Sequence, residues 1–170
     1  MHENLLIVMV GLPRSGKSTW AKQQNLPIVN PDSIRLALHG ERYIQLAEPF
    51  VWAIAKLMVR ALFLAGHTEV ILDATNTTRK ARDNWLEPEW RTVFKEVNTW
   101  RGVCLERADE ELKPVIERMC DTYEILEDDE EVLKLNPELI CSKCGDDRWC
   151  KISGIGSVCS ACGLPMGVIW

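Results

Sequence analysis

The chain has 170 residues and a mass of 19.4 kDa, which favours one core domain with a small appendage. Hydrophobic residues make up 46% of the sequence and charged residues 26%, a globular composition that argues against a disordered chain. The formal net charge of -5 excludes a generally basic nucleic-acid coat and leaves only local basic patches as contacts for a polymer.

Strands are predicted to alternate with helices along most of the chain. We expect strands at 5–10, 27–30, 69–73 and 91–97, and helices at 17–24, 31–39, 49–65, 77–89, 103–107 and 114–126. The first strand is an uninterrupted apolar run, typical of a strand buried on both faces. The order predicts an α/β fold with a parallel sheet covered by helices on both faces.

Two features bear on where the chain resides. The longest apolar stretch, 51–66, contains Lys56 and Arg60 and is not expected to cross a membrane unaided. The N-terminal residues contain no basic region of the kind that begins a signal peptide, and they lead directly into a motif. We therefore expect a cytoplasmic chain with no membrane partner.

A phosphate-binding motif follows the first strand. Residues 11–18 fit G-x4-G-K-[ST] at every fixed position, between a buried strand and a helix. The glycines let backbone N–H groups surround phosphate oxygens, and the start of the helix adds partial positive charge. Lys17 is expected to reach the β- and γ-phosphates of ATP, and Ser18 to hold Mg²⁺. The predicted nucleotide-binding residues of this loop are Gly11, Arg14, Ser15, Gly16, Lys17, Ser18 and Thr19.

Acidic residues follow the second and third strands. Asp32 and Arg35 lie three residues apart, on one face of a helix. An aspartate here can accept a proton from an attacking hydroxyl, and an arginine beside it can bind an acceptor phosphate. The alternative is that Asp32 only complements the helix dipole. Asp73 ends an aliphatic strand as in a Walker B element, near Mg²⁺, although 73–76 is also typical of a turn before a helix cap.

Taken together, these motifs resemble those of the polynucleotide 5′-hydroxyl kinases. That family transfers the γ-phosphate of ATP to the 5′-hydroxyl of a nucleic-acid end. The resemblance covers about residues 4–125, and its motifs occur in order at 15–21, 29–35 and 73–85. It implies a P-loop NTPase-type sheet, with ATP and Mg²⁺ as cofactors and a DNA or RNA end as partner.

The resemblance also implies roles for single residues. Lys17 would act on the phosphates, Asp32 as general base, Arg35 on the acceptor phosphate, and Asp73 on the acceptor side or the metal. Arg107 would belong to a lid segment and contact the phosphates of ATP.

The lid segment departs from the pattern of the family. A second arginine usually follows the first, and the acidic run 108–111 stands in its place. Either closure over ATP is weaker, or another basic residue such as Arg101 or Arg118 substitutes. The sequence contains no D-x-D-x-T element, so the phosphatase domain that is fused to some members is not expected.

Two other functions remain open. The first is a P-loop kinase for a small acceptor, such as a nucleoside, a sugar nucleotide or a metabolite. The near-neutral charge of residues 1–125 favours it, because polymer binding usually recruits a basic surface. The second is a nucleotide-gated binding module, in which Asp32 would have no role.

Charge and cysteine content change towards the C-terminus. Residues 126–138 carry six acidic and one basic residue, which predicts a linker at 127–138 between a kinase domain at 1–126 and a small subdomain at 139–170. Two C-x2-C-G motifs in that subdomain supply four thiolates at a spacing that suits tetrahedral Zn²⁺. The expected zinc ligands are Cys141, Cys144, Cys159 and Cys162.

The cysteine pattern is similar to that of a zinc ribbon. A hairpin is expected between the two cysteine pairs, with a glycine turn within 153–157. Two disulfides are the alternative, which the expected cytoplasmic location disfavours. Trp149 would either stack on a nucleobase or pack on the ribbon's own sheet. The sequence does not predict the oligomeric state.

Overall fold

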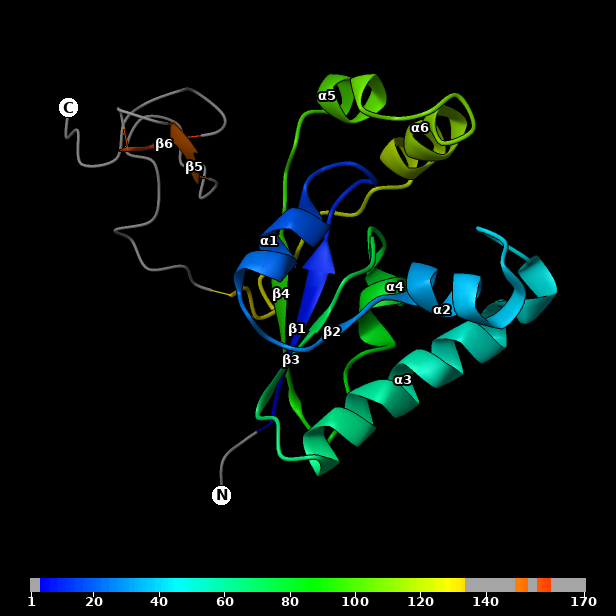
Figure 1. The fold of residues 1–170 in the computed structure, drawn as a ribbon, viewed down its shortest axis with the longest axis vertical. Coiled ribbons are helices and arrows are strands. Elements are labelled where there is room, and N and C mark those ends of the chain that lie inside the picture. The colour runs from blue at the N-terminus through cyan, green and yellow to red at the C-terminus, as the bar shows by residue number, and fades with distance from the viewer. Residues whose placement is uncertain (1–3, 134–148, 153–155, 160–170) are drawn as a thin grey trace. The chain divides into compact units, whose positions relative to one another are not determined.

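The computed structural model describes residues 4–133, 149–152 and 156–159. The chain divides into two compact units, Met1–Leu133 and Lys134–Trp170, and each is considered by itself. The first unit contains the strands β1 (Leu5–Val10), β2 (Ile28–Val29), β3 (Glu69–Leu72) and β4 (Arg91–Glu96), the helices α1 (Lys17–Gln23), α2 (Pro31–His39), α3 (Glu48–Leu64), α4 (Arg79–Asp83), α5 (Arg101–Glu106) and α6 (Lys113–Asp121), and a 3-10 helix, η1, at Gln45–Ala47 (Figure 1).

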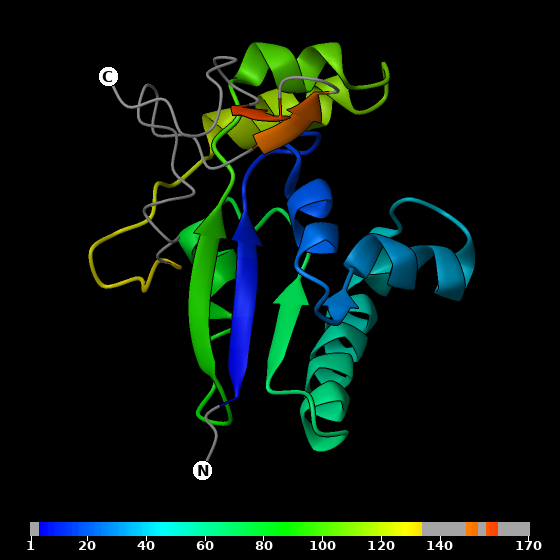
Figure 2. The same cartoon turned by 60° about the vertical axis from the view of Figure 1, so that its left-hand side comes forward.

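A parallel sheet forms the centre of the first unit, as the alternation of strands and helices predicts. Its strand order is β2-β3-β1-β4 (Figure 2). The register places Leu5 of β1 opposite both Glu69 of β3 and Arg91 of β4. Helices α5 and α6 lie beyond the carboxyl ends of the strands (Figure 2). In open α/β sheets this end is where ligands bind.

Both faces of β1 are covered. Leu6, Val8 and Val10 belong to one apolar cluster, and the alternating Ile7 and Met9 are buried as well. The long helix α3 covers the first of these faces through its buried side chains Val51, Ala55 and Val59. The apolar run of β1 is therefore buried on both faces, as the sequence predicts.

The ends of α2 are fixed by local chemistry. The side-chain oxygen of Asn30 accepts a hydrogen bond from the backbone N–H of Ser33 at 2.8 Å, and Pro31 occupies the first helical position. Gly40 ends the helix with a φ of +77°, a conformation that favours glycine. The sequence predicts both ends correctly.

Helix α4 is shorter than predicted. It ends at Asp83 rather than near Glu89. The carbonyl oxygen of Trp85 accepts hydrogen bonds from the indole N–H of Trp90 at 3.0 Å and from the hydroxyl of Thr92 at 2.7 Å. These side chains occupy the carbonyl that a continued helix would use for its own ladder.

Helix α6 is also shorter than predicted, ending at Asp121 rather than near Leu126. Arg82 of α4 donates to the carbonyl oxygens of Glu124, at 2.9 Å, and Ile125, at 3.2 Å. The chain therefore leaves the helix to bring these carbonyls to a buried guanidinium.

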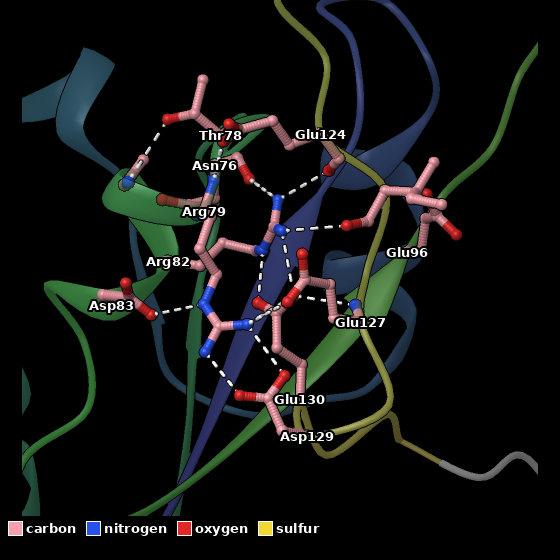
Figure 3. A network of polar contacts seen from close by, with 12 residues as sticks. Asn76, Thr78, Arg79, Arg82, Asp83, Glu96, Glu124, Glu127, Asp129 and Glu130 are labelled. Carbon is pink, nitrogen blue, oxygen red and sulfur yellow. Dashed lines mark hydrogen bonds and ion pairs between the residues drawn. The ribbon is translucent and has the colours of Figure 1, made fainter.

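Residues 122–133, named the strap here, continue along the edge of β4. The guanidinium of Arg82 is fully buried and pairs with the equally buried carboxylate of Glu130 at 2.5 Å (Figure 3). The backbone N–H of Phe94 donates to the carbonyl oxygen of Glu131 at 2.8 Å, and that of Leu133 donates to the carbonyl oxygen of Phe94 at 2.9 Å. The strap is thus part of the packed unit.

Arg79 adds exposed ion pairs to the same network, with Asp129 at 2.7 Å, Asp83 at 2.8 Å and Glu127 at 3.1 Å (Figure 3). The sequence predicts a linker at 127–138, whereas residues 127–133 pack on the first unit. Acidic composition alone could not show that these carboxylates have arginine partners on α4.

The second unit contains an antiparallel hairpin of β5 (Trp149–Ile152) and β6 (Gly156–Cys159), in which Trp149 is paired with Cys159. Of the expected zinc ligands, Cys141, Cys144 and Cys162 lie outside the described residues, and only the backbone of Cys159 is described. Within the described parts of the chain, no helix is long and apolar enough to cross a membrane.

Candidate active site

The segment between β1 and α1 folds as a phosphate-binding loop. Gly11, Arg14 and Gly16 have positive φ angles of 146°, 63° and 102°. A Cβ atom on Gly11 would lie 2.6 Å from the carbonyl oxygen of Val97, so a larger residue does not fit there. Such a loop, followed directly by a helix, turns its N–H groups towards an anion.

Residues that follow β3 and β4 hold this loop in place. The N–H of Gly11 donates to the carbonyl oxygen of Thr75 at 2.9 Å. The side-chain amide of Asn76 donates to the carbonyl oxygen of Met9 at 2.9 Å. The hydroxyl of Thr99 donates to the carbonyl oxygen of Ser15 at 2.7 Å. No sequence signal distinguishes Thr99, because this contact spans most of the domain.

Lys17 is buried inside the loop. Its ammonium group donates to the carbonyl oxygen of Leu12 at 2.6 Å. Burial lowers the pKa of Lys17 to about 8, although the negative charges of Asp73 and Asp32 act in the opposite direction. Lys17 is thus held inside the loop by a hydrogen bond and loses its proton more readily than an exposed lysine.

Asn30 links the two acidic segments. Its side-chain N–H₂ donates to the buried carboxylate of Asp73 at 3.0 Å and to the carbonyl oxygen of the same residue at 3.2 Å. Its side-chain oxygen caps α2, on which Asp32 lies two residues further along. Asn30 therefore joins the start of α2 to the end of β3, through bonds that span 43 residues of sequence.

The predicted pair Asp32 and Arg35 is in contact and has a third member. Arg35 donates to Asp32 at 2.6 Å and, through two parallel bonds of 2.7 Å, to Glu48 at the start of α3. The Asp32 side chain is 81% exposed, whereas that of Arg35 is 11% exposed and lies over the ring of Trp52.

Hydrogen bonds keep Arg35 and Glu48 charged. The hydrogen bond to Glu48 raises the pKa of Arg35, and the hydrogen bond from Arg35 lowers the pKa of Glu48. An exposed carboxylate is thus held beside a guanidinium that remains a cation. No local spacing predicts a role for Glu48, which lies thirteen residues from its partner.

The oxygen donors near the loop fit Mg²⁺ better than a softer metal. Ser18 and Thr19 are exposed in the first turn of α1, and Asp73 supplies a carboxylate. Mg²⁺ is usually held by few protein oxygens together with water and substrate phosphates. Among the described residues, no group of three or more His, Cys, Asp or Glu side chains forms a metal site.

The lid segment lies over the loop. Arg107 at the end of α5 donates to the carbonyl oxygen of Arg14 at 3.4 Å, which places it beside the phosphate-binding loop. Arg101 lies 3.5 Å from Glu117 on α6, and Arg118 is exposed. Neither of these two arginines is placed at the loop by a described contact.

Comparisons with known proteins agree with this geometry. A family model described as an AAA domain matches residues 6–110, more than half of the chain. The chain belongs to this family. The AAA domain includes the phosphate-binding loop, the acidic segments and the start of the lid. No curated protein matches the chain.

Solved structures with the fold of this AAA domain include several kinases. The chain is 28% and 26% identical to chains in two structures of a Pnkp1/Rnl/Hen1 complex, one described as an RNA repair complex, with TM-scores of 0.58 and 0.62. The matches cover 64% and 72% of this chain but only 40% and 44% of those chains, so it spans less than half of their length.

Two smaller enzymes share the fold over most of their own length. A sugar kinase from Janibacter sp. HTCC2649 has 22% identity and a TM-score of 0.56, with 78% of this chain and 84% of that chain covered. A gluconokinase from Sinorhizobium meliloti 1021 has 18% identity and a TM-score of 0.51, with 78% and 82% covered. The AAA domain therefore has a P-loop kinase fold.

Proposed function

We propose that this protein is an ATP-dependent kinase that phosphorylates the 5′-hydroxyl of a nucleic-acid end. The observation that carries the proposal is the pair Asp32 and Arg35, with Arg35 held by Glu48 and the start of α2 joined through Asn30 to Asp73 at the end of β3. An exposed carboxylate suits proton transfer, and a fixed guanidinium suits an acceptor phosphate. The similarity to the Pnkp1 chains supports a nucleic-acid acceptor.

In this mechanism the proton of the acceptor hydroxyl passes to Asp32. The hydroxyl oxygen forms a bond to the γ-phosphorus, while the bond from that phosphorus to the β,γ-bridging oxygen breaks and ADP leaves. Lys17 stabilises the charge that develops on the phosphates. Bound Mg²⁺ would neutralise phosphate charge, and Ser18 and Asp73 are the residues that would hold it.

Arg35 is the residue that would select the acceptor. The described bonds account for three of the five N–H donors of a guanidinium. The proposal assigns the other two to the phosphate 3′ of the terminal nucleoside. Glu48 orients the guanidinium in advance, so that little side-chain freedom is lost when the acceptor binds.

The test compares acceptors in one assay with labelled ATP. The panel contains 5′-hydroxyl RNA and DNA oligonucleotides, a nucleoside 3′-phosphate, a bare nucleoside and gluconate. We expect label on the oligonucleotides and the 3′-phosphate, and little on the other two. Equal transfer to gluconate or to the bare nucleoside would contradict the proposal.

An Arg35→Lys variant sharpens this test, because lysine keeps the charge and loses the planar fork. For the nucleoside 3′-phosphate, kcat/KM should fall by about ten- to a hundredfold. The residual activity on the bare nucleoside should hardly change. An equal loss on both acceptors would assign Arg35 to ATP or to the fold.

A small-acceptor kinase is the second candidate. The observation in its favour is the charge balance of residues 1–125, which carry 16 basic and 17 acidic residues. A kinase that holds a polymer through many phosphates usually has an excess of basic residues. The same panel of acceptors distinguishes the two functions.

A further inference from the structure

One carboxylate in the lid segment is shared by two arginines from other parts of the fold. The Oδ2 atom of Asp109 lies 3.1 Å from Nη1 of Arg42 and 3.8 Å from Nη2 of Arg14. Arg14 belongs to the phosphate-binding loop, and Arg42 lies in the connection between α2 and η1. Arg107 lies beside them, through its contact with the carbonyl oxygen of Arg14.

The side chains of this cluster are partly accessible. Those of Arg42 and Arg14 are 67% and 50% exposed, and that of Asp109 is 39% exposed. The hydrogen bond from Arg42 holds the pKa of Asp109 below its ordinary value, so this carboxylate is an anion at neutral pH. An oxygen anion between guanidinium groups, beside a phosphate-binding loop, has the chemistry of a bound phosphate oxygen.

The position of Arg42 determines which phosphate it can serve. It follows α2, the helix that carries Asp32 and Arg35, and the shared Asp109 carboxylate places it near Arg14 of the loop. The γ-phosphate is the part of ATP that meets the acceptor. Of the three phosphates, the γ-phosphate is therefore the one that a residue after the acceptor-binding helix would serve.

We propose that Arg42 is a binding residue for the γ-phosphate of ATP, and that the Asp109 carboxylate occupies the position of a phosphate oxygen when no nucleotide is bound. Arg42 then supplies the cation that the acidic lid segment lacks. When ATP binds, a phosphate oxygen replaces the Asp109 carboxylate on Arg42 and Arg14, and no covalent bond changes. This inference rests on the proposed kinase function.

A different reading of the same contact is that Asp109 and Arg42 form a latch that holds the lid in position. The two readings predict opposite effects of Asp109→Asn. If Asp109 competes with phosphate, its neutralisation strengthens ATP binding. If the pair is a latch, its loss weakens ATP binding.

The test measures equilibrium dissociation constants for ATP and ADP by calorimetry on the full chain. Arg42→Ala should weaken ATP binding by about tenfold, the loss of one charge-assisted contact, and should change ADP binding by less than about twofold. Asp109→Asn should strengthen ATP binding by about two- to fivefold, as expected for an exposed ion pair. Arg60→Ala, which removes an arginine of α3 that pairs with Glu89, is the matched control and should bind ATP as the wild type does.

The double variant completes a cycle. In the Asp109→Asn background, Arg42→Ala should weaken ATP binding by at least about tenfold, because no Asp109 carboxylate then competes with the phosphate for Arg42. No effect of Arg42→Ala in that background, or weaker ATP binding by Asp109→Asn alone, overturns the inference. Thermal melting of each variant confirms that binding is compared between folded proteins.

Steady-state kinetics separates this inference from the proposed function. Arg42→Ala should raise the KM for ATP and leave the KM for the acceptor unchanged. If the wild type binds no ATP, the proposed function fails together with this inference. If the wild type binds ATP and transfers phosphate while Arg42→Ala behaves like Arg60→Ala, only the inference is overturned.

Discussion

Burial of Lys17 gives nucleotide binding a dependence on pH. The protonated ammonium is the form that binds phosphate, and burial lowers its pKa to about 8. Affinity for ATP should therefore be highest below about pH 8 and fall by up to about tenfold per pH unit above it. Titration calorimetry at several pH values measures this, and Lys17→Arg, which keeps its charge, should show no such fall. A constant affinity in the wild type would contradict the prediction.

Asp32 can be tested without disturbing the fold, because its side chain is 81% exposed. Asp32→Asn keeps the shape and removes the base. We expect kcat to fall by about 10²–10⁴-fold, the usual effect of losing a general base, with an unchanged melting temperature. A fall of less than about threefold would return Asp32 to the role of a residue that complements the helix dipole.

The sequence identifies those site residues that belong to short local motifs. Lys17 follows from the loop motif, and Asp32 with Arg35 from one helical turn. Glu48 and the second bond of Asn30 are different, since their partners lie 13 and 43 residues away. Such contacts depend on how α2, α3 and β3 pack, which local spacing does not determine.

At the scale of elements, Arg82 holds the strap to α4. Its side chain is 0% exposed and that of Glu130 is 1% exposed, so each charge depends on the other. Glu130→Gln should lower the free energy of unfolding by about 3–5 kcal/mol, the usual effect of removing one partner of a buried ion pair. Urea denaturation measures this loss.

The same strap offers a matched control. Glu131 pairs with Arg91, and both side chains are about half exposed. Glu131→Gln should change the free energy of unfolding by less than about 1 kcal/mol, as is typical of surface ion pairs. Equal effects of the two variants would show that burial does not set the importance of Glu130.

The lengths of α4 and α6 show what local patterns cannot predict about elements. Their apolar and polar periodicity continues beyond Asp83 and Asp121, where the helices end. Both ends are set by side chains that take carbonyl oxygens for tertiary hydrogen bonds. The capping signals of α2, by contrast, are local and predict both of its ends.

For the whole molecule, the boundary between the units is open to a direct test. A fragment of residues 1–133 keeps Glu130 and should fold with a cooperative unfolding transition. A fragment of residues 1–126 leaves the guanidinium of Arg82 buried without its carboxylate and should be unfolded or strongly destabilised. Circular dichroism during thermal denaturation compares the two. Equal stability would show that residues 127–133 are dispensable for the first unit.

The second unit should bind one Zn²⁺ per chain through Cys141, Cys144, Cys159 and Cys162. Elemental analysis of natively purified protein measures the stoichiometry, and replacing Cys144 by Ser should lower it. A metal-free protein, or a disulfide between these cysteines in mass spectrometry, would contradict the prediction. Removal of zinc by a chelator should unfold this unit and leave the melting of residues 1–133 unchanged.

The backbone groups at the two edges of the central sheet determine whether another copy of the chain can add a strand to it. One edge is β2, only two residues long, and the other is β4, where Phe94 is already hydrogen-bonded to the strap. Long bare edges are templates for aggregation. A protease that cut within 122–133 would free β4 to pair with other molecules. Such damage should appear as light scattering from assembling chains.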